Sequence, residues 1–189
     1  MSPRTRADLL PVEARVARLV VTAQNPLYLF VTGATSPPHY LSSVNQPART
    51  QTLLVVEDNP DHQTLLRYVI QRSLANTTPI FTDSADQAME YLNACVSTEL
   101  APPKLVLLDL YLPNAEHGWQ FLRQMKQLPA QVRPPVVVLS VSQEEEDIAQ
   151  AYRLGASSFI SKPVGEAQWL TYFETIRRYW WETVTLPTQ

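Results

Sequence analysis

The sequence has a single cysteine, little charge and no long apolar run, and each scarcity excludes a class of protein. Cys95 is the only cysteine among 189 residues, so the chain cannot form an internal disulfide and fits a reducing cytoplasm. No apolar stretch approaches the roughly 20 residues that a membrane-spanning helix needs. The net charge of -3 does not favour binding to nucleic acid. Hydrophobic residues make up 45% of the chain, which is enough for a full core.

Residues 1–50 differ in texture from the rest of the chain. They hold several separate prolines and a cluster of Ser, Thr and Pro over residues 32–43. Such a segment buries too little apolar surface to fold firmly, so we predict a disordered or poorly packed leader. An export signal is disfavoured, because polar residues and Pro26 interrupt the apolar part. The predicted folded domain covers residues 51–182, followed by a short tail over 183–189.

From Thr52 onward, short apolar runs alternate with helical patterns. The runs predict five strands, at residues 52–56, 79–82, 105–108, 135–139 and 158–160. The helical patterns follow them. The first starts near Pro60 behind Asn59 as N-cap, the second behind Ser84 or Asp83 as N-cap, and the others cover residues 118–128, 144–154 and 165–182. Strands that alternate with helices predict an α/β fold, a doubly wound parallel sheet with helices on both faces.

Polar residues stand where four of these strands end. Glu57 and Asp58 follow the first strand, Asp109 the third, Ser140 the fourth, and Lys162 comes just after the fifth. Right-handed crossovers bring the carboxyl ends of all strands to one edge, where such sheets bind ligands. We therefore expect these residues to converge, although they are far apart in the chain.

This set of side chains suits phosphoryl chemistry. Three neighbouring carboxylates repel one another and need a compensating cation. Carboxylate oxygens in an open site suit Mg²⁺, which would neutralise a phosphoryl group arriving on Asp109. Lys162 supplies a fixed positive charge, and Ser140 supplies a hydroxyl for a phosphoryl oxygen. The constellation indicates an aspartate that acts as a nucleophile toward phosphorus.

The segments that carry these residues are V-V-E-D-N-P, L-L-D-L-Y-L-P, V-V-L-S and S-K-P. In this order and spacing they resemble the receiver domain of two-component response regulators over about residues 52–182. The resemblance implies a flavodoxin-like sheet with strand order 2-1-3-4-5 and five helices. It further implies that Asp109 accepts the phosphoryl group, and that Glu57, Asp58, Asp109 and the backbone carbonyl of Tyr111 hold Mg²⁺, for which Mn²⁺ can substitute.

The resemblance also implies roles at the other end of the site. Ser140 and Lys162 would contact the phosphoryl group, and Phe159 stands where the family keeps its switching aromatic residue. The bond between Lys162 and Pro163 is expected to be cis. The chain would then be a signalling domain that catalyses its own phosphotransfer and dephosphorylation, with a sensor histidine kinase as its partner and a phosphotransfer protein as a second candidate.

Three further features are similar to a narrower group, the stand-alone receivers that are paired with phytochrome-type histidine kinases. They are the E-D-N-P opening, the S-Q-E-E-E-D-I segment and a last helix that ends in aromatic residues. Two departures stand out. Glu57 occupies a position where many receivers have Asp. The loop over residues 114–117 is one residue longer than the corresponding loop of the family.

Simpler explanations exist for single residues. Glu57 and Asp58 suit a helix N-terminus electrostatically, a lone Lys162 is usually a solvated lysine, and His62 is expected to be an exposed histidine.

A phosphohydrolase with an aspartate nucleophile would need a second carboxylate two residues on, where the sequence has Tyr111. A pseudo-receiver, a protein-binding module that never takes phosphate, is the remaining alternative, although five intact site positions argue against it.

The last helix carries two sets of aromatic residues. Trp169, Phe173, Ile176 and Trp180 recur at helical spacing and predict a stripe buried on the sheet. The aromatic residues off this stripe, Tyr172, Tyr179 and Trp181, are expected to be exposed, which is typical of an interface. The simpler alternative is that one or two of them fold over the edge of the sheet. We therefore predict a homodimer through the helix at 144–154, the strand at 158–160 and the last helix, and signalling through protein contacts.

Overall fold

The computed structural model describes residues 20–22, 25–28, 50–98 and 100–185. The chain divides into two units, Met1–Asn45 and Gln46–Gln189. The described part of the first unit is an antiparallel pair of short strands, β1 (Val20–Thr22) and β2 (Asn25–Tyr28). Apart from the exposed Thr50, the rest of the predicted leader lies outside the described residues, so its lack of packing stays a prediction.

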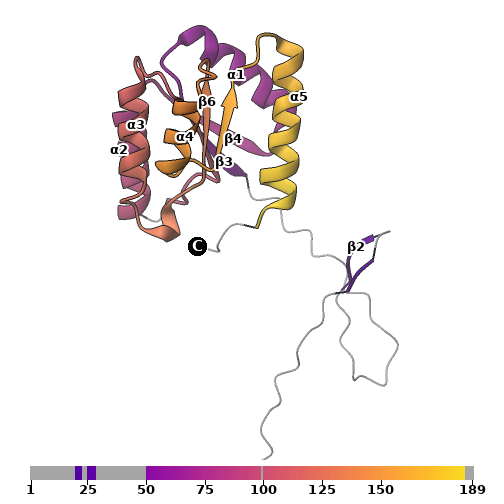
Figure 1. Cartoon of the computed structure of the whole chain (residues 1–189). Helices are drawn as coiled ribbons and strands as arrows, with labels where there is room; N and C mark the ends of the chain where they lie inside the picture. The colour runs from indigo at the N-terminus through magenta and orange to yellow at the C-terminus, as the bar shows by residue number, and fades with distance from the viewer. Residues whose placement is uncertain (1–19, 23–24, 29–49, 99, 186–189) are drawn as a thin grey trace, which may run out of the picture. The chain divides into compact units, whose positions relative to one another are not determined.

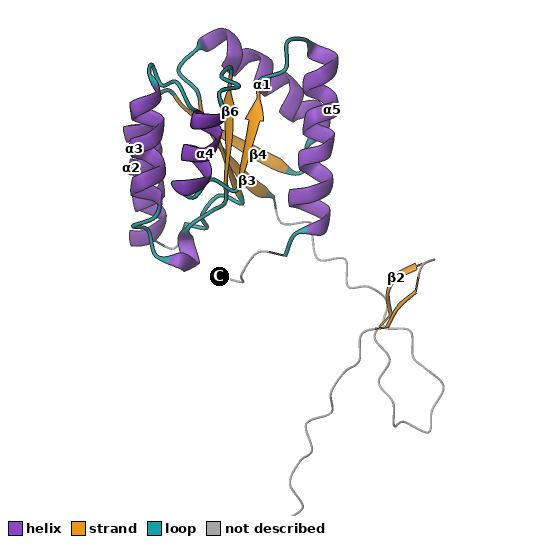
Figure 2. Cartoon of the chain, in the orientation of Figure 1, coloured by secondary structure: helices purple, strands orange, loops and turns teal. Residues whose placement is uncertain are grey.

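The second unit is built on one parallel sheet of five strands. Its strands are β3 (Gln51–Val56), β4 (Thr77–Thr82), β5 (Leu105–Asp109), β6 (Val136–Ser140) and β7 (Ser158–Ser161). Their spatial order is β4-β3-β5-β6-β7, and each neighbouring pair is parallel. Counted within this unit, the order is 2-1-3-4-5, which confirms the predicted doubly wound topology (Figures 1 and 2).

Five α-helices connect and follow the strands. They are α1 (Pro60–Ser73), α2 (Ala85–Ser97), α3 (Ala115–Met125), α4 (Glu145–Arg153) and α5 (Glu166–Ile176), with a short 3₁₀ turn at Ala130–Val132. Asn59 caps α1 as predicted and accepts the amides of Asp61 and His62. Of the two candidates for α2, Ser84 is the cap, and it accepts the Gln87 amide. The predicted start of the third helix at Gly118 is wrong. The Asn114 side chain accepts the amide of Glu116, so α3 begins at Ala115 instead.

The strands alternate their side chains between two separate cores. On β5, Leu105 and Leu107 face a core that contains residues of α1 and α5, whereas Val106 and Leu108 face a core of α2 and α3 residues. All four side chains are fully buried, as a strand covered on both faces requires. Figure 1 shows α2 and α3 together on one side of the sheet and α5 on the other.

Two glycines are required by their backbone surroundings. Gly155 has a φ of 97° and follows the C-cap of α4, which confirms the predicted stop of that helix. Gly118 lies in α3, close to the residue that follows β5, and an added Cβ would overlap the Leu110 carbonyl oxygen. This close approach holds α3 against the segment that immediately follows Asp109.

The C-terminal helix corrects one part of the sequence-based picture. The predicted stripe of Trp169, Phe173, Ile176 and Trp180 is buried, as expected. After Ile176, however, the chain becomes π-helical over Arg177–Thr183. The wider π turn shifts the side chains that follow it, so Trp181 also packs against the core.

Of the three aromatic residues expected to be exposed, only Tyr179 is, at 53% of its surface. Trp181 and Tyr172 are half-buried and pack against the core that contains residues of α1 and α5. Lys104 lies over the Trp181 ring, with its ammonium nitrogen 5.8 Å from the ring centroid. Burial raises the pKa of Tyr172, which agrees with this enclosed position.

The expectation of a cis Lys162–Pro163 bond is wrong. Among the described residues, the cis bond is the one between Leu112 and Pro113, in the segment that follows β5. The two isomers of a bond before proline differ by only about 1 kcal/mol, so local packing decides between them.

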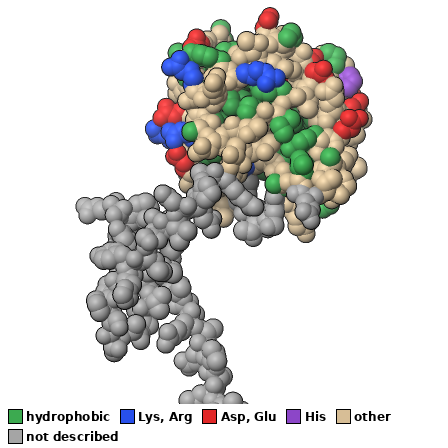
Figure 3. Space-filling view, turned by 180° about the vertical axis from the view of Figure 1, so that it is seen from behind, with side chains coloured by type: hydrophobic (Ala, Val, Ile, Leu, Met, Phe, Trp, Pro, Cys, Tyr) green, Lys and Arg blue, Asp and Glu red, His purple; other side chains and the backbone are tan. Residues whose placement is uncertain are grey.

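The surface of the domain carries charges of both signs. Figure 3 shows acidic and basic side chains interspersed over one face, with apolar groups between them. Among the described residues, no helix combines the length and apolar content that crossing a bilayer requires.

Cys95 supplies a test of the packing of α2. Its side chain is buried, and burial raises the pKa of its thiol above the ordinary value of 9.0. Less thiolate is therefore present at pH 8, and an alkylating reagent reaches the thiol only when the helix opens locally. We expect alkylation by iodoacetamide to be at least about tenfold slower in the native protein than in denaturant. Equal rates in the two conditions would show that α2 is not packed as described.

Candidate functional site

The register of the sheet brings Glu57 and Asp109 level with each other. Val56 of β3 pairs with Leu108 of β5, so the next residues of the two strands, Glu57 and Asp109, reach the carboxyl edge together. Both side chains are buried, with 1% of Glu57 and 7% of Asp109 exposed. Two carboxylates removed from water at neighbouring positions require a cation between them.

Lys162 provides that cation. Its ammonium Nζ lies 2.7 Å from Asp109 Oδ2 and 2.8 Å from Glu57 Oε2, and only 7% of its side chain is exposed. The backbone carries it there, because the Lys162 amide donates to the Ser140 carbonyl at 2.7 Å, just beyond the paired strands β6 and β7. The site is therefore a buried triad of two carboxylates and one ammonium.

The electrostatics of Asp109 reflect this enclosure. Burial raises the pKa of its carboxyl group above the ordinary value, and the charge of Glu57 acts in the same direction. Lys162 opposes both effects through its charge and its hydrogen bond, and the Tyr111 amide donates to Asp109 Oδ1 at 3.2 Å. The net direction is upward, so the carboxylate is desolvated more than it is compensated.

His62 contacts the site directly, whereas the sequence placed it only near the site, as an exposed histidine without a role there. Its Nδ1 lies 3.2 Å from Glu57 Oε1 and 3.2 Å from Lys162 Nζ. The signal was its position in the first turn of α1, directly behind the acidic pair and the cap Asn59. A helix that starts there turns its first residues toward the sheet edge, so the expectation of a merely exposed histidine is wrong.

Asp58 and Tyr111 lie beside this triad. Asp58 is half-buried next to Glu57 and is not one of the residues whose ligand atoms converge most closely. Tyr111 follows β5, and its hydroxyl donates to Asp147 Oδ2 at 3.0 Å, which ties the segment after Asp109 to α4.

Ser140 and Phe159 occupy the β6 and β7 side of the edge. Ser140 is fully buried at the end of β6, and its hydroxyl oxygen accepts the Ser142 amide at 3.1 Å. Phe159 lies in β7, is half-buried, and packs against the core formed with α2 and α3. Its amide donates to the Tyr152 hydroxyl of α4 at 3.2 Å.

The predicted site residues are thus gathered at the carboxyl edge of the sheet, from segments throughout the domain. Glu57, His62 and Asp109 form a group with one ligand atom each, all within 4.8 Å of one another. Within the described residues this is the one group of three or more potential metal ligands. Such a set can hold a cation and present a carboxylate oxygen to an incoming electrophile.

The sequence matches the family of the response regulator receiver domain over residues 53–174. This match covers more than half of the chain, and the sheet order and the acidic edge described above agree with it. The protein therefore belongs to the response regulator receiver family.

Individual relatives place it near phytochrome response regulators. It is 33% identical over 138 residues to response regulator Rcp1 of Synechocystis sp., covering 72% of this chain and 93% of that protein. The solved structure of the phosphorylated cyanobacterial phytochrome response regulator RcpA has a TM-score of 0.64 at 31% identity, over 73% of this chain and 99% of RcpA. The Mn²⁺-bound form of Rcp1 has a TM-score of 0.62 at 33% identity, over 73% and 99%.

The buried triad predicts a stability that depends on divalent cations once Lys162 is removed. Lys162→Met leaves two buried carboxylates without their ammonium, so we expect a loss of about 3 kcal/mol in the free energy of unfolding in EDTA. Millimolar Mg²⁺ should restore part of this loss, because it supplies the missing positive charge. Urea denaturation with EDTA and with Mg²⁺ measures both effects.

The matched control for this experiment is Arg178→Met. Arg178 pairs with Glu174 at 2.9 Å on the surface of the C-terminal helix, where 70% of its side chain is exposed. Its loss should change the free energy of unfolding by no more than about 0.5 kcal/mol, with or without Mg²⁺. A Lys162→Met protein that behaves like this control would contradict the buried triad.

Proposed function

We propose that the chain is a single-domain response regulator in which Asp109 accepts a phosphoryl group from a phosphohistidine donor. The observation that carries this proposal is the Asp109 carboxylate, buried at the carboxyl end of the central strand β5 and hydrogen-bonded to Lys162. Membership in the receiver family and the similarity to phosphorylated RcpA support it.

In the proposed step, a carboxylate oxygen of Asp109 attacks phosphorus. The new P–O bond forms as the P–N bond of the donor breaks, and the bonding electron pair stays on the donor imidazole, which takes up a proton. Lys162 stabilises charge on the phosphoryl oxygens, and Ser140 donates its hydroxyl hydrogen to one of them. Attack by water on the aspartyl phosphate then returns the carboxylate and releases phosphate.

The residues at this edge fit a divalent metal ion. Two carboxylates are buried close together, and burial raises the pKa of Asp109 despite the charge of Lys162. One ammonium therefore does not fully compensate the two negative charges, and a further cation would stabilise them. We propose that Glu57, Asp58, Asp109 and the Tyr111 backbone carbonyl hold Mg²⁺, or Mn²⁺ in its place. A bound ion would neutralise charge on the phosphoryl oxygens during transfer. The Mn²⁺-bound form of the related Rcp1 supports this assignment.

The response to phosphorylation is proposed to run from Ser140 to Phe159. A hydroxyl drawn toward the phosphoryl group would leave space at the end of β6, into which the half-buried Phe159 ring can turn. Because the Phe159 amide is bonded to Tyr152, this movement would reach α4 directly.

The partners follow from the same proposal. A sensor histidine kinase would supply the phosphoryl group, and the phytochrome-type relatives suggest a photoreceptor kinase. A phosphotransfer protein is a second candidate donor or acceptor. We place the protein in the cytoplasm, with residues 51–182 as the signalling domain and residues 1–50 as a leader that contributes little to it.

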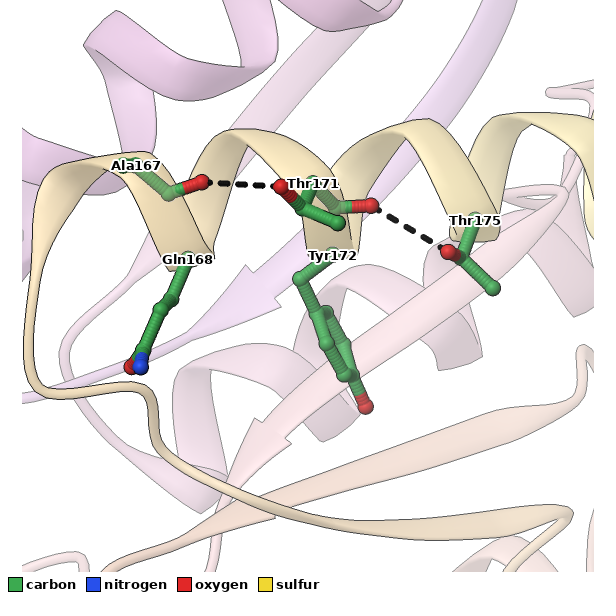
Figure 4. A pocket seen from close by; sticks show the side chains of 5 residues that line it. All are labelled: Ala167, Gln168, Thr171, Tyr172 and Thr175. Atoms are coloured by element: carbon green, nitrogen blue, oxygen red, sulfur yellow. Dashed lines mark hydrogen bonds between the residues drawn. The ribbon is translucent and has the colours of Figure 1, made fainter.

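We also propose a homodimer through the face formed by α4, β7 and α5. Tyr152 of α4 and Tyr179 beyond α5 are both exposed, and the flank of α5 carries a hollow of about 300 Å³. Figure 4 shows this hollow beside Gln168 and Tyr172, with the Thr171 and Thr175 hydroxyls bonded back to their own helix. Side chains that satisfy themselves within the helix leave an apolar flank suited to a second copy.

Phosphorylation tests the main proposal. The full chain should take up one phosphoryl group from acetyl phosphate in Mg²⁺ and none in EDTA, measured by intact-mass spectrometry at low temperature. Asp109→Asn should abolish uptake, because the amide is not a nucleophile toward phosphorus. The control is Asp86→Asn, an exposed aspartate in the first turn of α2, which should label as wild type. Labelling that survives in Asp109→Asn would refute the assignment.

Sedimentation tests the dimer. A beryllofluoride mimic of the phosphoryl group should increase the dimer fraction of the wild type. Tyr179→Ala should lower that fraction, because Tyr179 is an exposed aromatic residue of the proposed interface. Val96→Ala removes an exposed apolar side chain on α2 and should have no effect. A wild type that remains monomeric at high micromolar concentration in both states would exclude the dimer.

A further inference from the structure

The His62 side chain is turned toward the centre of the acidic site. Glu57, His62 and Asp109 each place one ligand atom within 4.8 Å of the others, and His62 Nδ1 lies 3.2 Å from Glu57 Oε1. The ring is 43% exposed, so one of its edges faces solvent while Nδ1 faces the carboxylates. Nothing in the proposed phosphotransfer requires an imidazole at this place.

These three donors already surround a cation. Lys162 Nζ lies 2.7 Å from Asp109 Oδ2, 2.8 Å from Glu57 Oε2 and 3.2 Å from His62 Nδ1. The position between two carboxylate oxygens and one imidazole nitrogen therefore accepts positive charge. A metal ion held by the Glu57 and Asp109 carboxylates would therefore have the His62 nitrogen close to it.

The start of α1 holds this arrangement in place. Asn59 caps the helix by accepting the amides of Asp61 and His62 at 2.9 and 3.2 Å. The Asn59 amide in turn donates to Glu57 Oε1 at 3.3 Å. The backbone of His62 and the carboxylate of Glu57 are thus fixed by the same capping residue, which preorganises their side chains relative to each other.

We propose that His62 is a nitrogen ligand of the divalent metal ion and shifts the selectivity of the site toward ions that bind imidazole. This inference rests on the proposed metal-dependent function and adds a ligand to it. Mg²⁺ takes oxygen ligands almost exclusively, whereas Co²⁺, Ni²⁺ and Zn²⁺ bind imidazole well. A site with only oxygen ligands would therefore bind Co²⁺, Ni²⁺ and Zn²⁺ less tightly than a site that contains His62.

The competing explanation is that His62 only braces Glu57. Its Nδ1 lies 3.2 Å from Glu57 Oε1, and a hydrogen bond there would orient the carboxylate without contact to the metal. A brace would support every metal ion equally, because it acts through an oxygen ligand. A direct His62 ligand would instead increase the affinity for imidazole-binding ions more than the affinity for Mg²⁺. It would also produce a measurable magnetic coupling between its nitrogen nucleus and a paramagnetic metal ion, which is the nitrogen signature.

Pulsed electron paramagnetic resonance of bound Mn²⁺ detects that signature. In the full chain, the spectrum of Mn²⁺ should show coupling to a nitrogen nucleus. This coupling should change from that of ¹⁴N to that of ¹⁵N when the protein is grown with ¹⁵N-histidine. His62→Gln should remove the coupling. His117→Gln should retain it, because His117 is exposed at the start of α3 and does not belong to the donor group. Histidine coupling that is absent from the wild type, or that survives in His62→Gln, would overturn the proposal.

Metal affinity provides the second measurement. His62→Gln should raise the Kd for Co²⁺ by at least about tenfold, since a direct ligand matters no less than an outer partner. The Kd for Mg²⁺ should change by less than about threefold, because its oxygen ligands remain. Equal weakening of both ions would assign His62 to bracing Glu57 and reject it as a ligand.

The outcomes separate this inference from the proposed function. A wild type that binds neither Mn²⁺ nor Mg²⁺ would refute the metal site and His62 together. Binding of both ions, with Mg²⁺-dependent phosphorylation of Asp109 but without a histidine signature, would refute only the role of His62.

Discussion

The buried contact of Lys162 with Glu57 and Asp109 is the constraint on which the functional edge depends. Each carboxylate alone would be costly to remove from water, and together they repel. The ammonium at 2.7 and 2.8 Å makes the arrangement possible. Because the three residues come from the ends of β3 and β5 and from just beyond β7, this one contact ties together strands that are not all neighbours in the sheet.

Such a triad is a poor source of stability, and its presence therefore points to function. Buried ion pairs often do no better than apolar residues of similar size. Here the rest of the edge is built around it. Gly118 permits close packing of α3 against Leu110, Asn59 fixes the start of α1 beside Glu57, and the Tyr111 hydroxyl bonds to Asp147 of α4. These contacts hold the Asp109 carboxylate in place and connect it to the face on which α4 and β7 lie.

The C-terminal helix shows where sequence patterns stop being sufficient. Helical spacing correctly predicted the buried stripe that includes Trp169 and Trp180. The same spacing placed Trp181 outside, which is wrong, because the chain becomes π-helical after Ile176 and turns two successive tryptophans inward. A period of 3.6 residues describes a regular α-helix, and a local change of winding is decided by what the side chains can pack against.

The sequence by itself determined the class of the fold and most of the residues that meet at the carboxyl edge of the sheet. Apolar runs ending in Glu57, Asp109, Ser140 and a following lysine are local patterns, and parallel topology then requires their ends to meet. Only the tertiary structure decided which side chains touch. His62 joins Glu57 and Lys162 while Asp58 stays beside them, and the cis bond precedes Pro113 instead of Pro163. These outcomes depend on side-chain direction and on small energy differences between alternatives, which are resolved by packing between segments far apart in the chain.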